Sequence, residues 1–539
     1  MDATSQEFHS RTFSIKLWPP SSSTRMMLVE KMTKTLSSES IFSRKYGLLS
    51  KEEALENAKK IEDESFTAAS EHFQNEPDGD GSSAIQFYAK QSSKLMLEVL
   101  KRGPRPKEDV EGFVKPTETV FDISGGTRSF IYAEEASQLL SPLAQKGNSY
   151  KKICFSNRSF GVDAAEVAAP ILASVKEQLT EVDLSDIVAG RPEDEALEVM
   201  KIFSSALEGC VLRYLNLSDN ALGEKGVRAF GALLKSQNSL EELYLMNDGI
   251  SEEAAKAVCE LIPSTGKLKI LHFHNNMTGD EGAIAISELL KHSPNLEDFR
   301  CSSTRVDSEG GIELAKALET CAHLKRIDLR DNIFGVEAGI TLSKTLEELV
   351  HVTEIYLSYL NLEDEGTIAI ANALKEFVPS LEVLDIAGNE ITPKAAQALA
   401  DCVSVKKSLR KLILSENELK DQGALLIAKA LEDGHTQLEE LDLSYNMIMR
   451  VGARCLAQAV SNKSDFKLLN INGNAISNEG IDEIKEILKN GKASENVLGP
   501  LDENDVEGEG EEGEEEEGAA EDDQGELESK LQHLKVEQD

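Results

Sequence analysis

The sequence of 539 residues has 96 acidic and 57 basic side chains, a formal net charge of −39, and 40% of its residues are hydrophobic. Nucleic acids and anionic membranes bind through clustered lysine and arginine, so this charge argues against both as partners, and no apolar run is long enough for direct membrane insertion. Seven cysteines without a C-x-x-C pair and the lack of a signal peptide predict a soluble, intracellular protein with reduced thiols.

Residues 1–102 are predicted to form a small all-α module. Ser50 and Glu53 have the spacing of a capping box, which opens the middle helix. Three helices are predicted, over residues 22–36, 50–74 and 82–102. Their limits follow from apolar residues at helical spacing and from the Gly-Pro pair that stops the last helix.

Residues 103–118 contain three prolines and mixed charge, and we predict that they form a linker. Residues 119–149 then lead into a longer array. They are expected to supply a strand over 120–123 and a capping helix over 134–143.

The main feature of the chain is a repeat of about 28 residues that runs through residues 150–495 with the frame L-x-x-L-x-L-x-x-N. This period is the signature of leucine-rich repeats, each a short strand followed by a helix. About 12 copies predict an α/β solenoid, similar to a ribonuclease-inhibitor-like horseshoe. The first, fourth and sixth positions should point inward, and the ninth-position asparagine should bind backbone groups of the turn. The clearest copy contains Leu212, Leu215, Leu217 and Asn220.

Residues 496–539 are predicted to be an acidic disordered tail. Residues 501–539 alone hold 18 acidic and 2 basic side chains. A composition of this kind cannot bury enough apolar surface to fold.

One repeat is longer than the others, because 33 residues separate Leu179 from Leu212. The extra length falls in the loop of residues 185–194 and places Arg191 between Gly190 and Pro192. One interpretation is a tolerated insertion with a solvated arginine. The other is a contact arm for a protein partner.

A row of polar residues follows the strands, at the eighth and ninth repeat positions. Turn hydrogen bonds account for the ninth position, but not for the residue before it. We therefore predict that the eighth-position side chains are free and form a polar rim that can orient a water or a glutamine of a partner. The pairs are Asp219-Asn220, Asn247-Asp248, Asn275-Asn276 and Asp331-Asn332.

Motifs of self-contained catalysis are lacking, since no P-loop, H-E-x-x-H, G-x-S-x-G or kinase signature occurs. The nine histidines do not have metal-ligand spacing, so no metal site is expected. The repeats by themselves favour a scaffold or inhibitor that only binds a protein partner.

Several stretches carry a more specific resemblance. They are AGRPEDEA at 189–196, YLNLSDNALG at 214–223, LYLMNDG at 243–249, LRDNIFG at 329–335 and KLWPPS at 16–21. With these stretches, the chain resembles the plant Ran GTPase-activating proteins that begin with a WPP domain. The similarity extends over essentially the whole chain.

This resemblance implies that the protein binds Ran-GTP and accelerates its hydrolysis by ordering the catalytic site of Ran, without an arginine finger. Nucleocytoplasmic transport and mitotic roles would depend on this activity. GTP and Mg²⁺ would belong to Ran, so no cofactor of the protein itself is expected.

The resemblance also assigns site residues. It places the GTPase-activating rim at Asn220, Asp331, Asn247 and Asp248, where the last replaces a second asparagine of the family. Arg191 and Asp219 are assigned to partner binding, with an interface or structural role for the arginine.

The WPP domain implies targeting to the outer nuclear envelope through coiled-coil proteins, with Trp18, Pro19 and Pro20 as the anchor. The lone tryptophan could equally be a core residue. Cytoplasm is the other expected location, with the spindle, cell plate or kinetochore in dividing cells. Import receptors and Ran-binding proteins are further expected partners, and the acidic tail either steers a basic partner or only maintains solubility.

Overall fold

The computed structural model describes residues 18, 20, 22–38, 49–75, 81–102, 119–125, 128–493 and 497–505. The chain divides into two compact units: residues 1–116 with 125–127, and residues 117–124 with 128–539. Pro19, the predicted linker and residues 506–539 lie outside the described residues.

The first unit contains three helices among its described residues, α1 (Ser22–Leu36), α3 (Lys51–Asn75) and α4 (Ser82–Arg102). They lie where the sequence predicted helices. The hydroxyl of Ser50 accepts a hydrogen bond from the backbone N–H of Glu53 at 3.2 Å, which is the expected N-terminal cap. The core of the unit includes Trp18, Leu36 and Tyr88.

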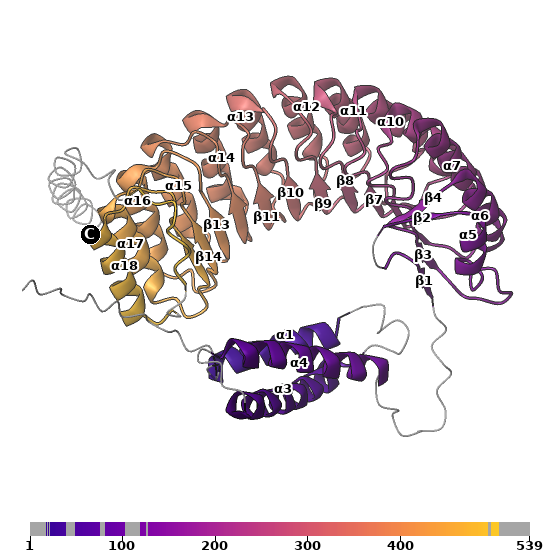
Figure 1. The fold of residues 1–539 in the computed structure, drawn as a ribbon. Helices are drawn as coiled ribbons and strands as arrows, with labels where there is room; N and C mark the ends of the chain where they lie inside the picture. Colours follow the sequence, from indigo (N-terminus) through magenta and orange to yellow (C-terminus); the bar gives the residue numbers. More distant parts are fainter. Residues whose placement is uncertain are drawn as a thin grey trace, which may run out of the picture. The chain divides into compact units, whose positions relative to one another are not determined.

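The second unit is a solenoid built on one parallel sheet of 13 strands in its described part, and neighbouring strands in the sheet are consecutive repeats. Figure 1 shows the strands on the inner side of the curved unit and the helices on its outer side. The strands are β1 (Val120–Asp122), β3 (Lys152–Cys154), β5 (Glu181–Asp183), β6 (Tyr214–Asn216), β7 (Glu242–Tyr244), β8 (Ile270–His272), β9 (Asp298–Arg300), β10 (Arg326–Asp328), β11 (Glu354–Tyr356), β12 (Val383–Asp385), β13 (Lys411–Ile413), β14 (Glu440–Asp442) and β15 (Leu468–Asn470).

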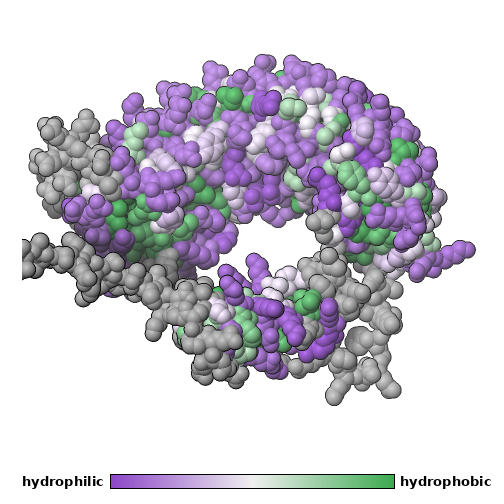
Figure 2. Space-filling view, viewed as in Figure 1, coloured by the Kyte–Doolittle hydropathy of each residue, from purple (hydrophilic) through white to green (hydrophobic). Residues whose placement is uncertain are grey.

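A small second sheet pairs β2 (Ser129–Ile131) with β4 (Arg158–Phe160). The surface over the helices is mostly hydrophilic on the face seen in Figure 2. The helices are α5 (Ala133–Leu139), α6 (Val162–Val175), α7 (Glu193–Ala206), α8 (Gly223–Ala229), α9 (Gly231–Lys235), α10 (Glu252–Leu261), α11 (Gly279–Lys291), α12 (Ser308–Leu318), α13 (Gly335–Leu346), α14 (Glu363–Phe377), α15 (Pro393–Val405), α16 (Lys420–Glu432), α17 (Arg450–Ser461) and α18 (Asn478–Asn490). Within the described residues, no helix combines the length and apolar content needed to cross a lipid bilayer.

The repeats follow the predicted frame, with Asp248, Thr304 and Leu360 in place of the ninth-position asparagine in three of them. Leu212, Leu215 and Leu217 are buried in the common core. The ninth-position Asn276 accepts hydrogen bonds from the backbone N–H groups of Asp248 and Ile250, both at 3.0 Å, and its amide donates to strand carbonyls. The predicted α/β solenoid and the structural role of the ninth position are therefore confirmed.

The solenoid continues further than the sequence suggested. Leu498 forms a parallel bridge with Leu469 of β15, and the side-chain oxygen of Asn504 accepts a hydrogen bond from the backbone N–H of Ile476 at 3.1 Å. Asn504 thus repeats the ninth-position contact for the last coil. The prediction that the tail begins at residue 496 is wrong for residues 497–505, because they close the end of the sheet.

Candidate functional site

Arg191 lies inside the long loop rather than on a projecting arm. Its side chain is only 6% exposed. The guanidinium donates to the Ser159 hydroxyl at 3.1 Å, to the Ser159 carbonyl at 2.7 Å and to the Ile131 carbonyl at 3.3 Å, and it pairs with Glu195 at 3.1 Å. It also lies 4.8 Å from the ring centre of Phe130.

These contacts connect four segments: the long loop, strand β2, strand β4 and the first turn of α7. The expectation of a solvated arginine or an exposed contact arm is wrong for this side chain, because its donors are used within the chain. Its assignment to partner binding stays a prediction, now of an indirect kind in which Arg191 fixes the loop.

The eighth repeat position adopts a left-handed backbone conformation. φ is 54° at Asp186, 64° at Asp219, 55° at Asn247 and 56° at Asp331. Asn and Asp tolerate this conformation better than other non-glycine residues. The polar residues at this position thus have a structural reason that the sequence analysis missed.

The eighth-position side chains are also not all free. The amide of Asn247 donates to Asp219 at 2.8 Å, and the amide of Asn275 donates to the Asn247 side-chain oxygen at 2.9 Å. The prediction of free side chains is therefore wrong for Asp219 and Asn247, which form a ladder along the rim. It holds for Asp331, which is exposed and whose side chain has no hydrogen-bond or ion-pair partner among the described residues.

Asn220 and Asp248 lie behind the rim and not on it. Both are buried. Asn220 donates to the carbonyls of Leu184 and Leu217 at 2.8 and 2.7 Å, and accepts from the backbone N–H of Ile187 at 2.9 Å. The assignment of Asn220 and Asp248 to the GTPase-activating rim stays a prediction, now of an indirect kind, because their side chains lie behind the rim and bond the turns.

Asp248 takes the place of an asparagine in this buried row. One carboxyl oxygen accepts a hydrogen bond from the backbone N–H of Asn220 at 2.8 Å, while the other has no hydrogen-bond partner in the structure. Burial raises the pKa of the Asp248 carboxyl well above its usual value. A neutral carboxyl can donate a proton to the carbonyls that an asparagine amide would bind.

A hollow of about 530 Å³ lies on the rim at the carboxyl ends of the strands, and it brings Asn247 and Asp331 together. Ninth-position Asn276 and Asn332 are also among its lining residues. Besides Gly249, three other tenth-position residues line it, and their side chains were not predicted from the sequence. They are Met277, Arg305 and Ile333.

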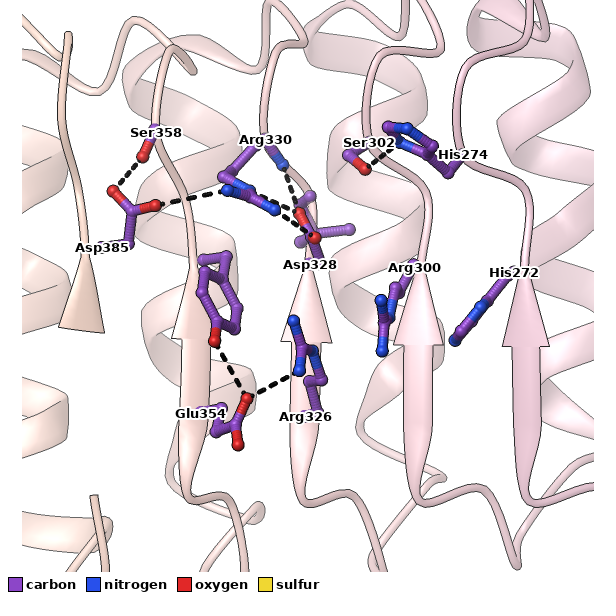
Figure 3. Close-up of polar contacts among 12 residues, drawn as sticks. His272, His274, Arg300, Ser302, Arg326, Asp328, Arg330, Glu354, Ser358 and Asp385 are labelled. Atoms are coloured by element: carbon purple, nitrogen blue, oxygen red, sulfur yellow. Dashed lines mark hydrogen bonds and ion pairs between the residues drawn. The ribbon is translucent and has the colours of Figure 1, made fainter. Parts of the chain in front are cut away.

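The concave face carries many charged groups, but they pair with one another. Figure 3 shows Arg330 between Asp328 and Asp385, and Arg326 beside Glu354. The Arg330–Asp328 and Arg326–Glu354 ion pairs measure 2.8 and 2.9 Å. The hollow on the rim, with its unpaired Asp331, is therefore the stronger candidate site.

In the first unit, Trp18 is a core residue with 4% exposure. Its ring stacks on Phe66 with a centroid distance of 5.3 Å and lies 6.0 Å from that of Tyr88. A Cβ added at Gly81 would lie 2.4 Å from the Trp18 Cβ, so the turn at Gly81 approaches the tryptophan closely. Of the two readings of Trp18, the core role is confirmed, whereas targeting stays a prediction.

Comparisons with known proteins match both units. The WPP domain model matches residues 14–110, and the Leucine Rich repeat model matches residues 210–231, 379–400 and 405–428. The chain is 67% identical to RAN GTPase-activating protein 2 of Arabidopsis thaliana, over 98% of each chain. It is 64% identical to RAN GTPase-activating protein 1 of the same plant, over 100% of this chain and 99% of that protein. The chain also matches MFP1 attachment factor 1 of Solanum lycopersicum with 37% identity. This match covers 21% of this chain and 73% of that protein.

Proposed function

The chain belongs to the family of RAN GTPase-activating proteins, and on this basis we propose that it stimulates GTP hydrolysis by Ran through the rim that carries Asn247 and Asp331. The observation that carries the function is the 67% identity over 98% of both chains. The protein is an activator, and the nucleotide and its Mg²⁺ are held by Ran.

The rim supplies positioning. The exposed carboxylate of Asp331 can accept a hydrogen bond from a glutamine amide or from a water, and such a contact orients a nucleophile without adding positive charge. Asn247 is held by hydrogen bonds to Asp219 and Asn275, so its amide is oriented before Ran binds. We assign the ordering of the catalytic glutamine of Ran to this part of the rim.

Arg191 is not the source of a catalytic positive charge in this proposal. Its guanidinium is bound to Ser159, Ile131 and Glu195. If the Arg191 side chain left these contacts to reach Ran, several hydrogen bonds of a nearly buried charge would break, and this would cost free energy.

The direct test is a phosphate-release assay with Ran-GTP and the full chain. Acceleration at substoichiometric amounts is expected, since an activator turns over. Binding without acceleration would instead support the scaffold or inhibitor function.

For the first unit, we propose attachment to the outer nuclear envelope through coiled-coil proteins, supported by the match to the WPP domain. Since Trp18 is buried, the attachment would use surface residues of the module, and the tryptophan would maintain its fold. Cytoplasm is the second proposed location, with the spindle, cell plate or kinetochore in dividing cells, and import receptors or Ran-binding proteins are further proposed partners. A fluorescent fusion protein that lacks residues 1–118 should no longer stain the nuclear envelope. Persistent staining of the nuclear envelope would contradict the proposal.

A further inference from the structure

The tenth repeat position forms one wall of the rim hollow, and its chemistry differs from that of the eighth position. Met277 is 46% exposed and Ile333 is 53% exposed. Arg305 lies in the repeat between them, is exposed, and makes no hydrogen bond or ion pair to the residues that the structure describes. Two apolar side chains and an unpaired cation thus line the same hollow as Asn247 and Asp331.

Only the walls of this hollow offer groups to a partner. The ninth-position Asn276 and Asn332 donate to backbone carbonyls and accept from backbone N–H groups, so their polar atoms are used. The eighth-position side chains that line the hollow are polar, and exchanging water for partner hydrogen bonds contributes little net affinity. Exposed apolar side chains that become buried are the usual source of affinity.

The hollow has an end along the rim. In the repeat after Asp331, the hydroxyl of Tyr359 donates to Glu416 at 2.6 Å. The Tyr359 ring passes over Gly388, where an added Cβ would lie 2.3 Å from ring atoms. Beyond Asp331, the side chains of Tyr359 and Glu416 thus bind each other. A partner contact that includes Asp331 therefore extends toward Met277 rather than toward Glu416.

We propose that Met277, Arg305 and Ile333 set the affinity for GTP-bound Ran by receiving an apolar side chain of Ran that lies beside a carboxylate. This inference rests on the proposed function. The apolar side chain of Ran packs between Met277 and Ile333, and the carboxylate pairs with the guanidinium of Arg305. The tenth position then determines binding, whereas the eighth position determines the rate of hydrolysis.

The experiment measures stimulated hydrolysis over a range of Ran-GTP concentrations for full-length Met277→Ala, Ile333→Ala and Arg305→Ala. KM should rise roughly tenfold for each, with kcat within twofold of wild type. The Arg305→Ala effect should shrink as ionic strength rises, because salt screens the lost ion pair.

Met447 provides a matched control. It occupies the tenth position of the β14 repeat on the same rim and is 53% exposed, but it does not line the hollow. Met447→Ala should leave KM and kcat unchanged. All four variants should keep the unfolding midpoint of wild type, since each shortens an exposed side chain.

Two results would overturn the inference. One is wild-type KM in both Met277→Ala and Ile333→Ala. The other is a loss of kcat by a factor of about 10³ or more in Arg305→Ala at unchanged KM, which would make Arg305 an arginine finger. If the wild-type chain itself fails to accelerate hydrolysis, the proposed function fails; if wild type accelerates and the variants match it, only this inference fails.

Discussion

Asparagine and aspartate side chains have different physical roles at the eighth and at the ninth repeat position. Asn220 is buried and its side chain binds backbone groups of two coils. Asp331 is exposed on a left-handed turn. Replacing the first therefore removes hydrogen bonds of the turn, whereas replacing the second removes a group that a partner can reach and leaves those hydrogen bonds in place.

Asn220→Ala and Asp331→Ala should accordingly differ in stability. The first leaves buried backbone groups unsatisfied and should lower the free energy of unfolding by about 3 kcal/mol. The second should lower it by only about 1 kcal/mol, because alanine tolerates the left-handed turn less well than aspartate does. Both should reduce stimulated hydrolysis, Asn220→Ala through a displaced Asp219 turn.

Chemical denaturation and the phosphate-release assay measure the two effects. A stable Asn220→Ala variant with reduced kcat would mean that Asn220 contacts Ran directly. Destabilisation by Asp331→Ala as large as that of Asn220→Ala would mean that this carboxylate supports the turn.

Asp248→Asn should stabilise the protein at neutral pH. The amide can donate to carbonyls where the carboxylate cannot, and removing the unsatisfied oxygen should add about 1–2 kcal/mol. The raised pKa fixes the sign of the pH dependence: the folded state keeps a proton that the unfolded chain releases above pH ~4. The stability contributed by Asp248 is complete below that pH and is lost as pH rises through the folded-state pKa.

The gain from Asp248→Asn should therefore be larger at pH 8 than at pH 5.5, as measured by urea unfolding of both proteins. Stimulated hydrolysis should be unchanged, because the side chain lies behind the rim. An equal gain in stability at the two pH values would show that the pKa of Asp248 is the same in the folded protein and in the unfolded chain.

At the level of elements, the guanidinium of Arg191 joins the long loop of residues 185–194 to its neighbours. Arg191 binds β4 through Ser159, the end of β2 through Ile131, and α7 through Glu195. A partly buried hydrogen bond also joins the Ser159 hydroxyl to the Ala189 carbonyl at 2.8 Å. The insertion is thus a packed part of the rim.

Arg191→Ala should free this loop and lower the free energy of unfolding by roughly 2–3 kcal/mol. Arg191→Lys should behave similarly, because one ammonium cannot reproduce the planar set of donors. Hydrogen exchange in residues 185–192 should rise in both variants, but not in Arg228→Ala, which removes an exposed ion pair on α8. Full activity and protection in Arg191→Lys would favour a charge-only contact with Ran.

The first unit depends on Trp18 in the same way. Trp18→Ala should lower the free energy of unfolding of this unit by about 3–5 kcal/mol, as for other large-to-small core changes. Hydrogen exchange should rise in α1, α3 and α4 while the solenoid stays protected, and nuclear-rim staining should be lost with stimulated hydrolysis retained. Met447→Ala, which shortens an exposed side chain of the solenoid, serves as the control and should leave both the exchange and the staining unchanged. Loss of rim staining with an intact module would instead make Trp18 a direct contact.

For the molecule as a whole, charge is concentrated at the C-terminal end. Residues 506–539 hold 15 acidic and 2 basic side chains. Because residues 497–505 close the solenoid, a truncation that leaves the fold intact has to begin after Asp505. Asp505 itself donates its backbone N–H to the Asn474 carbonyl at 2.8 Å.

Deletion of residues 506–539 should change the salt dependence of KM more than kcat. Long-range steering acts through fields that salt screens, with a Debye length of about 8–10 Å at physiological ionic strength. A tail of equal length with glutamine at the acidic positions should behave like the deletion. Identical salt profiles for deletion and wild type would favour the solubility role.

The sequence alone determined the repeat, the three helices of the first unit and the family, because periodicity and motifs are local in the chain. The frame predicted that Leu215 points inward and that Asn276 binds a turn, since every repeat has the same local geometry. It could not show that the eighth position has positive φ.

Only the tertiary structure decided which polar side chains are free. Arg191 is bound by residues 32 and 60 positions away in the chain, and the partners of Asn247 lie one repeat before and after it. The hollow is likewise formed by neighbouring repeats, which place Met277, Arg305 and Ile333 beside Asp331. Stacking of the coils brings these side chains together, and the spacing within one repeat does not contain that information.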